Sequence, residues 1–180
     1  MTTEALKSTA ITNLDAAPVV ENTAGHGAPA YLHEVDGFVT VSASMAATST
    51  YRLVRVPTKA IMKHLFFESE AQGAGKFNLS LYYSDSTTDG TKVANQGLIV
   101  PTTGDQLFAS DIDCASAVAS ADKINESGNF GWDKRQKQLW DAAGLTSDPG
   151  GYFDIVAVVH TTDVTTGTGK LGVAAQFVYG

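Results

Sequence analysis

The sequence predicts an all-β fold: an antiparallel β-sandwich, jelly-roll-like domain with one short helix and an extended N-terminal arm. About seven or eight short segments alternate apolar and polar side chains, which is the pattern of strands buried on one face. Gly, Pro, Asn and Asp separate these segments at short intervals, as in sandwiches and barrels. Strands do not alternate with helical segments, so a parallel sheet is not expected.

Residues 1–36 differ from the rest of the chain and are predicted to form the arm, extended or partly disordered. They are rich in Ala, Thr, Asn and Pro, are interrupted at Gly25-His26-Gly27, and carry no sustained apolar period. Residues 37–180 are predicted to form the sandwich domain. The arm can fold onto its own domain or onto a neighbouring molecule, and the sequence leaves both open.

Five segments alternate clearly enough to be assigned as strands. In one of them Phe77 and Leu79 are expected to face inward and Asn78 outward. Another ends at Pro57, because proline has no N–H to donate to a β ladder. The five segments are residues 38–44, 51–56, 77–83, 152–160 and 171–179.

Three further segments are less regular. Residues 59–68 are dense in Ile, Leu and Phe and fit a helix by pattern, but the Phe pair and the short Pro and Gly boundaries favour a strand. The alternation of residues 105–121 is broken, as at a bulge or at a short strand followed by an irregular stretch. Residues 92–100 are predicted to hold a short edge strand, and residues 161–169 a hairpin loop.

One helix is predicted, beginning at the N-cap candidate Asp133 and ending before Gly144, which suits a left-handed C-cap. Leu139 shares a face with apolar neighbours at helical spacing. Trp132 and Trp140 are therefore expected to pack in the core rather than to stack on sugars.

Composition and charge exclude several classes of function. The chain has 180 residues, of which 43% are hydrophobic and 17% charged, and a net charge of −7. A nucleic-acid binder needs a basic surface, and so does a protein held electrostatically at a membrane, so neither partner is expected. A sparsely charged surface is typical of a protein partly covered by a partner. No secretory signal and no apolar run near the ~18 residues of a membrane helix is visible, which predicts synthesis in a cytoplasm.

The chemistry-bearing residues do not converge on a site. Cys114 is the one cysteine, so no intramolecular disulfide is possible, and its acidic neighbours make it a poor nucleophile; we expect it to be a small buried residue. The pairs Asp111/Asp113 and Asp85/Asp89 lack the remaining ligands of a calcium loop and are expected to be solvated.

Histidines and arginines give no clearer signal. His26, His33, His64 and His160 show no metal-ligand or catalytic spacing. Arg52 and Arg55 are three residues apart in one strand, so they are expected on opposite faces, as ordinary surface arginines or with one of them in an interface. We therefore assign no catalytic, cofactor-binding or metal-binding residue and expect no enzyme activity.

Two glycine-rich strings resemble phosphate-binding motifs. Residues 167–172 read GTGKLG, but they join two β segments, whereas a dinucleotide site needs a following helix. A hairpin tip is the better interpretation. Residues 73–76 read GAGK and lack both the first glycine and the Ser or Thr of a phosphate loop. Neither string predicts a cofactor.

The order of four segments resembles the head decoration or cement proteins of tailed, podovirus-like bacteriophages. The segments are residues 49–57 (STYRLVRVP), 79–85 (LSLYYSD), 107–113 (LFASDID) and 126–156. The resemblance implies a β-sandwich or jelly-roll domain without catalytic residues, bound to the exterior of the capsid in the virion. It also implies the major capsid (coat) protein of the same phage as partner. Because coat lattices present symmetric positions, a homo-oligomer, dimer or trimer, is expected.

Two other classes of function stay open. A head-fibre or tail component with a carbohydrate- or receptor-binding role would show exposed aromatic side chains beside Asp and Asn in loops, whereas most aromatics here lie in predicted strands. A small hydrolase would need a pocket holding a perturbed titratable group, and the sequence shows no constellation for one. The sequence therefore favours the structural role.

Overall fold

The computed structural model describes residues 31–41, 49–84, 106–160 and 169–179. The chain divides into two compact units, Met1–Tyr31 and Leu32–Gly180, and the elements below all belong to the second. The predicted edge strand at residues 92–100 and most of the predicted loop at residues 161–169 lie outside the described residues. None of the described helices is long and apolar enough to span a membrane.

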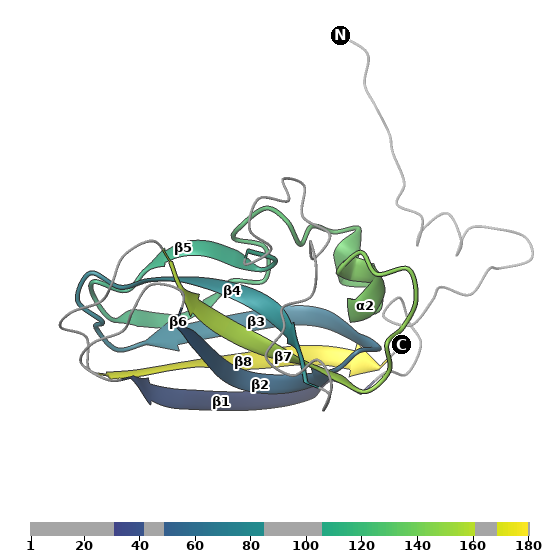
Figure 1. Cartoon of the computed structure of the whole chain (residues 1–180), viewed down its shortest axis with the longest axis horizontal. Coiled ribbons are helices and arrows are strands. Elements are labelled where there is room, and N and C mark those ends of the chain that lie inside the picture. Colours follow the sequence, from purple (N-terminus) through teal and green to yellow (C-terminus); the bar gives the residue numbers. More distant parts are fainter. Residues whose placement is uncertain (1–30, 42–48, 85–105, 161–168, 180) are drawn as a thin grey trace, which may run out of the picture. The chain divides into compact units, whose positions relative to one another are not determined.

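Two antiparallel sheets of four strands each form a sandwich (Figure 1), as predicted. The first sheet has the order β1-β8-β3-β6 and the second the order β2-β7-β4-β5. The strands are β1 (His33–Val41), β2 (Thr50–Pro57), β3 (Ala60–Ser69), β4 (Lys76–Tyr83), β5 (Ala109–Asp113), β6 (Val118–Asp122), β7 (Tyr152–Val159) and β8 (Gly169–Tyr179). The segment expected to begin near Gly37 thus starts at His33.

The chain passes from one sheet to the other at almost every connection. Among the described strands, only β4 and β5 are consecutive in the sequence and belong to the same sheet. The pairs β1-β8, β2-β7, β3-β6 and β4-β5 are all hydrogen-bonded, and β8 and β7 are joined further to β3 and β4. Residues far apart in the sequence therefore lie side by side in both sheets.

The core fills the space between the sheets with the inward side chains of the alternating strands. Phe77, Leu79 and Leu81 of β4 are fully buried, as the alternation predicted. They meet inward residues of β3 and β7, among them Phe67 and Ile155, in one continuous cluster. The period-two pattern therefore identified the buried face of these strands.

β-Bulges interrupt the alternation where the sequence was hardest to interpret. In β3 the register shifts between Met62 and His64, so Lys63 is an extra residue and Met62 and Leu65 both face the core. This spacing of three imitates a helix, yet residues 59–68 form a strand, as predicted. A second shift lies opposite Asn78, where Asp111 of β5 adopts a left-handed φ of 53°.

The predicted helix over residues 133–143 is wrong in extent. A 3₁₀ turn, η1 (Lys134–Gln136), and a single α-helical turn, α2 (Leu139–Ala142), replace it, because Lys137 and Gln138 are extended. The break lets Leu139 enter the core and the Trp140 N–H donate to the carbonyl of Thr58 at 3.1 Å. Asp133 precedes η1 but makes no side-chain cap.

The C-terminal end of α2 is as predicted. Gly144 has a φ of 81°, and its N–H donates to the carbonyl of Asp141 at 2.9 Å. The Leu145 N–H donates to the carbonyl of Trp140 at 3.1 Å, which completes a Schellman motif. Glycine is favoured here because it adopts this conformation without a steric cost.

Candidate interaction surface

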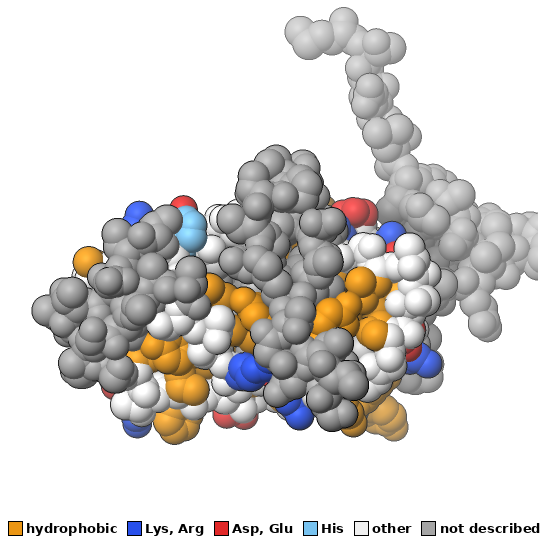
Figure 2. Space-filling view, viewed as in Figure 1, with side chains coloured by type: hydrophobic (Ala, Val, Ile, Leu, Met, Phe, Trp, Pro, Cys, Tyr) orange, Lys and Arg blue, Asp and Glu red, His pale blue; other side chains and the backbone are white. Residues whose placement is uncertain are grey.

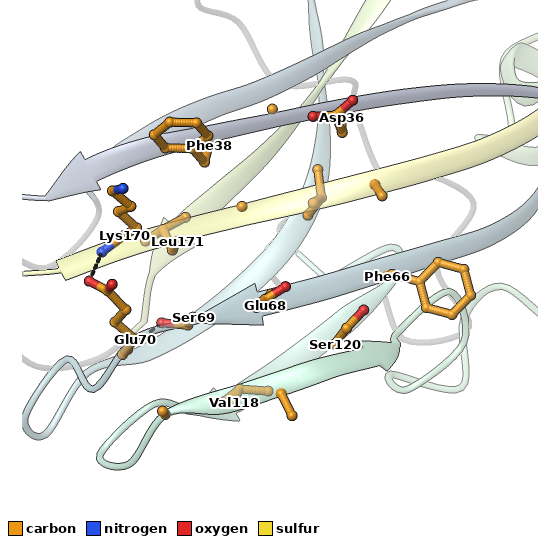
Figure 3. A pocket seen from close by; sticks show the side chains of 16 residues that line it. Asp36, Phe38, Phe66, Glu68, Ser69, Glu70, Val118, Ser120, Lys170 and Leu171 are labelled. Carbon is orange, nitrogen blue, oxygen red and sulfur yellow. Dashed lines mark hydrogen bonds between the residues drawn. The ribbon is translucent and has the colours of Figure 1, made fainter.

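A groove of about 590 Å³ crosses the outer face of the first sheet, the face turned away from the second sheet. All four strands of the sheet contribute to it (Figure 3). Its central residues are Asp36 and Phe38 of β1, Lys170, Gly172 and Ala174 of β8, and Phe66, Glu68 and Glu70 near or in β3. On the β6 side it is lined by residues 117–120.

Two cross-strand rows give the groove its pattern. In one row Gly172 lies between Phe38 and Glu68, its partners on β1 and β3. In the next row Ala174 lies between Asp36 and Phe66. The order of aromatic and acid is thus reversed from row to row, and Figure 3 shows the two phenyl rings at opposite corners with Glu68 between them.

The groove is hollow because the central strand carries the smallest side chains at these two positions. A Cβ at Gly172 would lie 2.8 Å from the Gly37 carbonyl oxygen and 3.0 Å from the Phe38 Cβ, so only glycine fits. Phe38 stands beside this gap with 64% of its surface exposed. The floor is therefore low and the aromatic walls are high.

The rim of the groove carries more acids than bases. Asp36 and Glu68 are exposed carboxylates of β1 and β3. Glu70 accepts a hydrogen bond from the Lys170 backbone N–H at 2.8 Å, which ties the end of β3 to β8. The Lys170 ammonium lies 5.2 Å from the centre of the Phe38 ring, a cation–π contact.

The groove ends at β6, an edge strand of the first sheet. β6 is short and mostly exposed or half-buried. Residues 115–121 read ASAVASA and carry no charge. The charged residue of β6, Asp122, is engaged by His64, so the rest of this edge lacks the usual charged device against pairing with another chain.

On the second sheet, Arg52 and Arg55 both bind the carboxylate of Asp154, so the prediction that they point to opposite faces is wrong. Leu53 is an extra residue in a bulge of β2, which turns both arginines outward. The Arg55 Nε donates to Asp154 at 2.6 Å and its Nη2 at 3.0 Å, and Arg52 donates to the same carboxylate. The Asp154 side chain is 4% exposed.

The charge state of Asp154 follows from these contacts. Burial acts to raise the pKa of the carboxyl, and the hydrogen bonds from Arg55 and Arg52 more than offset it. The net effect is a pKa below the ordinary value. The cluster is thus a fixed, paired carboxylate that ties β2 to β7, and it offers no group poised to exchange a proton near neutral pH.

Other side chains on the outer side of the second sheet are also buried. Asn78 of β4, predicted to face away from the core, does so but is only 1% exposed, and Ser80 on the same face is fully buried. Tyr82, Val156 and Val158 form a small apolar cluster of their own there. The sequence pattern predicted the direction of the polar residues and missed their burial.

Two histidines bind single carboxylates. His64 Nδ1 lies 2.7 Å from Asp122, and His160 Nδ1 contacts Asp111. Within the described part of the chain no three His, Cys, Asp or Glu side chains gather as a metal site would require. Asp111 and Asp113 do not converge on one point, because the Asp113 carboxylate accepts the Ala115 N–H instead. Asp85, Asp89 and His26 lie outside the described residues.

Cys114 is fully buried, as predicted. Burial raises the pKa of its thiol to about 11, and the charge of Asp113 acts in the same direction. The Sγ lies 3.7 Å from the Ile112 carbonyl oxygen. A buried thiol with this pKa is unreactive near neutral pH.

The two tryptophans differ. Trp140 packs partly against the core, and its Nε1 donates to the Gln138 side chain at 2.7 Å. Trp132 is 81% exposed, so the expectation that it packs in the core is wrong. The guanidinium carbon of Arg135 lies 5.4 Å from the centre of the Trp132 ring, a cation–π contact. Trp132 lies in a turn ahead of η1, outside the regular elements.

Neither glycine-rich string forms a phosphate site among the described residues. Gly169 and Gly172 lie inside β8, and no helix follows them. Residues 73–75 form the turn between β3 and β4, closed by the Gly75 N–H donating to the Gln72 carbonyl at 3.1 Å. The interpretation of residues 167–172 as a hairpin tip is therefore wrong for residues 169–172, which belong to the strand β8.

The described surface displays apolar side chains with few charges among them. Figure 2 shows hydrophobic side chains exposed on one face of the described part of the molecule, with charged side chains along its rim and a basic group nearer its middle. The large exposed hydrophobic residues include Phe38, Trp132, Tyr152 and Tyr179. Such a surface is suited to a protein partner.

Comparison with known proteins shows a likeness of fold. A chain from the capsid of Ralstonia phage GP4 matches with a TM-score of 0.54 and 13% identity, over 89% of this chain and 89% of that chain. A chain from the capsid asymmetric unit of cyanophage Pam1 matches with a TM-score of 0.45 and 15% identity, over 92% and 97%. No family model and no curated protein matches the sequence. At such low identity the GP4 match shows a shared fold.

Proposed function

We propose that this chain is a non-enzymatic structural protein of a phage particle, which binds the outer surface of the capsid and stabilises the coat lattice as a decoration or cement protein. The observation that carries the proposal is the likeness of fold, across nearly nine tenths of both chains, to a chain in the capsid of Ralstonia phage GP4. The order of sequence segments that resembles head decoration proteins supports it independently.

The strand pairing supports a jelly-roll interpretation of the sandwich. Pairing β1 with β8, β2 with β7, β3 with β6 and β4 with β5 is the pairing of one long hairpin of eight strands wrapped into two sheets. This arrangement leaves broad sheet faces and edge strands as the surfaces for contact.

The partner in this proposal is the major capsid protein of the same phage. A cement protein bridges several coat subunits, so that weak contacts add as avidity. A symmetric dimer or trimer matches the symmetric positions of such a lattice. The sparse surface charge and exposed apolar side chains of the described residues fit a protein that works while partly covered.

Sedimentation with capsids that lack this protein tests the proposal. Labelled full-length protein is mixed with such capsids from the same phage, and bound protein is measured against coat protein, with excess unlabelled protein as competitor. We expect saturable binding at a fixed ratio to coat protein and a higher temperature of capsid disruption. Binding that is absent, or that does not saturate, contradicts the proposal.

A head-fibre or tail component that binds carbohydrate is the second candidate. Trp132 favours it, because this ring is exposed in a loop next to the acid Asp133, an arrangement typical of sugar-stacking sites. A glycan array with the wild-type protein and Trp132→Ala tests it. Glycan binding that is lost in W132A, together with no binding to capsids, would replace the first candidate by the second.

A further inference from the structure

We propose that the groove on the outer face of the first sheet binds an extended segment of a coat subunit in which basic and apolar side chains alternate. The inference rests on the proposed function for the identity of the partner. The groove itself is defined by the described residues of β1, β8, β3 and β6.

The shape of the groove suits an extended chain. Crossing from β1 to β6 covers three inter-strand spacings, about 14 Å, which an extended peptide spans with about four residues. Gly172 and Ala174 leave room above the sheet, and Phe38 and Phe66 stand at opposite corners. Apolar side chains of a bound segment can fill the gap and pack against both rings.

The charge of the groove selects the polar side chains of that segment. Each small floor residue has one carboxylate as a cross-strand neighbour, Glu68 for Gly172 and Asp36 for Ala174. Glu70 adds a third acid at the rim, and among the described residues that line the groove Lys170 is the one base. A segment with Lys or Arg between its apolar residues would place cations beside these acids, which sets orientation and partner choice.

Other occupants fit less well. Residues 1–30 of the chain itself hold one base, Lys7, and three acids, so they would bring like charge to the rim. A second copy of the chain carries a net charge of −7, so it too would bring negative charge to the acidic rim of the groove. Nucleic acid is excluded by the same sign of charge. The complementary partner is a basic and apolar segment of another protein.

Capsid binding by matched variants tests the groove within the proposed function. Glu68→Lys reverses a rim charge, and Asp133→Lys makes the same change in net charge on an exposed residue outside the groove. Ala174→Trp fills the groove, and Thr50→Trp adds the same ring to an exposed position of the second sheet. We expect the affinity for capsids to fall about fivefold in E68K and about tenfold or more in A174W. The two controls should bind like the wild type.

A peptide titration tests the chemistry of the occupant without capsids. The peptides KVRVKV and EVEVEV, both capped, are added to labelled full-length protein, and backbone amide shifts are followed by NMR. We expect KVRVKV alone to shift the amides of Gly172 and Ala174, less so at high salt and not in A174W. Equal response to both peptides, or shifts that avoid the groove, would overturn the inference.

The two experiments separate failure of the inference from failure of the function. If the wild-type protein does not bind capsids, the coat subunit is ruled out as the partner and the proposed function is overturned. Wild-type binding that E68K and A174W leave unchanged keeps the function and overturns the groove. Circular dichroism of each variant confirms that it is folded, and a conservative variant, Glu68→Gln, should weaken binding less than E68K.

Discussion

At the scale of single residues, the paired carboxylate of Asp154 is a buried polar restraint on the second sheet. It is almost fully buried and receives hydrogen bonds from Arg52 and Arg55, two residues that a bulge in β2 brings to one face. A bidentate guanidinium–carboxylate pair fixes geometry as well as charge. Asp154 therefore holds β2 in register against β7 at the bulge, where the ladder is weakest.

Replacing this carboxylate should destabilise the fold in a pH-dependent way. We expect Asp154→Asn to lower the free energy of unfolding by about 2 kcal/mol at pH 7, since two guanidinium groups lose their partner. The pKa of Asp154 is below its ordinary value, so the charged carboxylate stabilises the fold above about pH 4. That contribution is lost as the pH falls through the lowered pKa.

Urea unfolding from pH 7 down to pH 2.5 measures this difference. The gap between wild type and D154N should be widest at neutral pH and narrow below about pH 4. Asp133→Asn, which neutralises an exposed carboxylate, serves as the control and should change stability little at any pH. A gap that stays constant with pH would mean that packing rather than charge holds the site.

Cys114 gives a second prediction at this scale. With a thiol pKa of about 11, roughly one in ten thousand thiols is ionised at pH 7, and the side chain is fully buried. We expect no reaction with Ellman's reagent in the native protein and release of one equivalent of chromophore in 6 M guanidinium chloride. Rapid labelling of the native protein at pH 7 would contradict the burial.

At the scale of elements, the bulges separate what the sequence could predict from what it could not. Regular strands such as β4 and β7 were predicted with their buried faces, because a period of two is visible in the residues themselves. In β2 the extra residue Leu53 shifts the phase, so strict alternation placed Arg52 and Arg55 on opposite faces. A bulge is defined by the partner strand, which a local pattern does not contain.

The predicted extent of the helix was wrong for a related reason. The segment from Asp133 to Ala143 has helical spacing, and its end at Gly144 was predicted because that signal is local. Its interruption at Lys137 and Gln138 depends on Leu139 entering the core and on the bond from Trp140 to Thr58 of the β2–β3 turn.

The groove was missed because its two rows join three strands that are distant in the sequence.

Deleting the bulge residue tests its role. Without Leu53, the run from Tyr51 to Val56 alternates regularly and keeps both arginines outward, opposite the same partners on β7. We expect the deletion variant to fold, with a loss of about 1–3 kcal/mol for the half-buried leucine. Deleting Val156 from the regular strand β7 instead inverts every residue on one side of the deletion, and that variant should not fold.

Thermal unfolding followed by circular dichroism distinguishes the two deletions. A cooperative transition is expected for the Leu53 deletion and none for the Val156 deletion. Equal loss of structure in both would mean that the bulge itself is required. The requirement would then be explained by the close approach of Leu53 to Gly37, where β2 and β1, edge strands of the two sheets, come together. A Cβ placed on Gly37 would lie only 2.2 Å from the Leu53 carbonyl oxygen.

At the scale of the whole molecule, the sandwich is built from β1 onward. β1 pairs with β8 over nine residues, and Val35, Val39 and Val41 pack on the core. Both sheets therefore have all their strands within the second compact unit, which begins at Leu32. The N-terminal arm, placed at residues 1–36 on sequence grounds, accordingly overlaps the first residues of β1.

Two truncations decide what the arm does, and each has a distinct expected result. Removing residues 1–30 leaves β1 intact, so we expect the melting temperature to change by less than about 3 °C. Removing residues 1–41 takes away an edge strand, uncovers β8 and strips three valines from the core, so the cooperative transition should be lost or lowered by more than about 10 °C.

The shorter truncation, bound to capsids in the sedimentation assay, then assigns the arm. If the arm contacts a neighbouring molecule, the truncated protein keeps its melting temperature and binds capsids more weakly, because one of several additive contacts is gone. If the arm folds onto its own sandwich, the melting temperature falls instead. Unchanged stability with unchanged binding would leave the sandwich alone as the binding unit, and the groove of the first sheet would then be the first surface on it to examine.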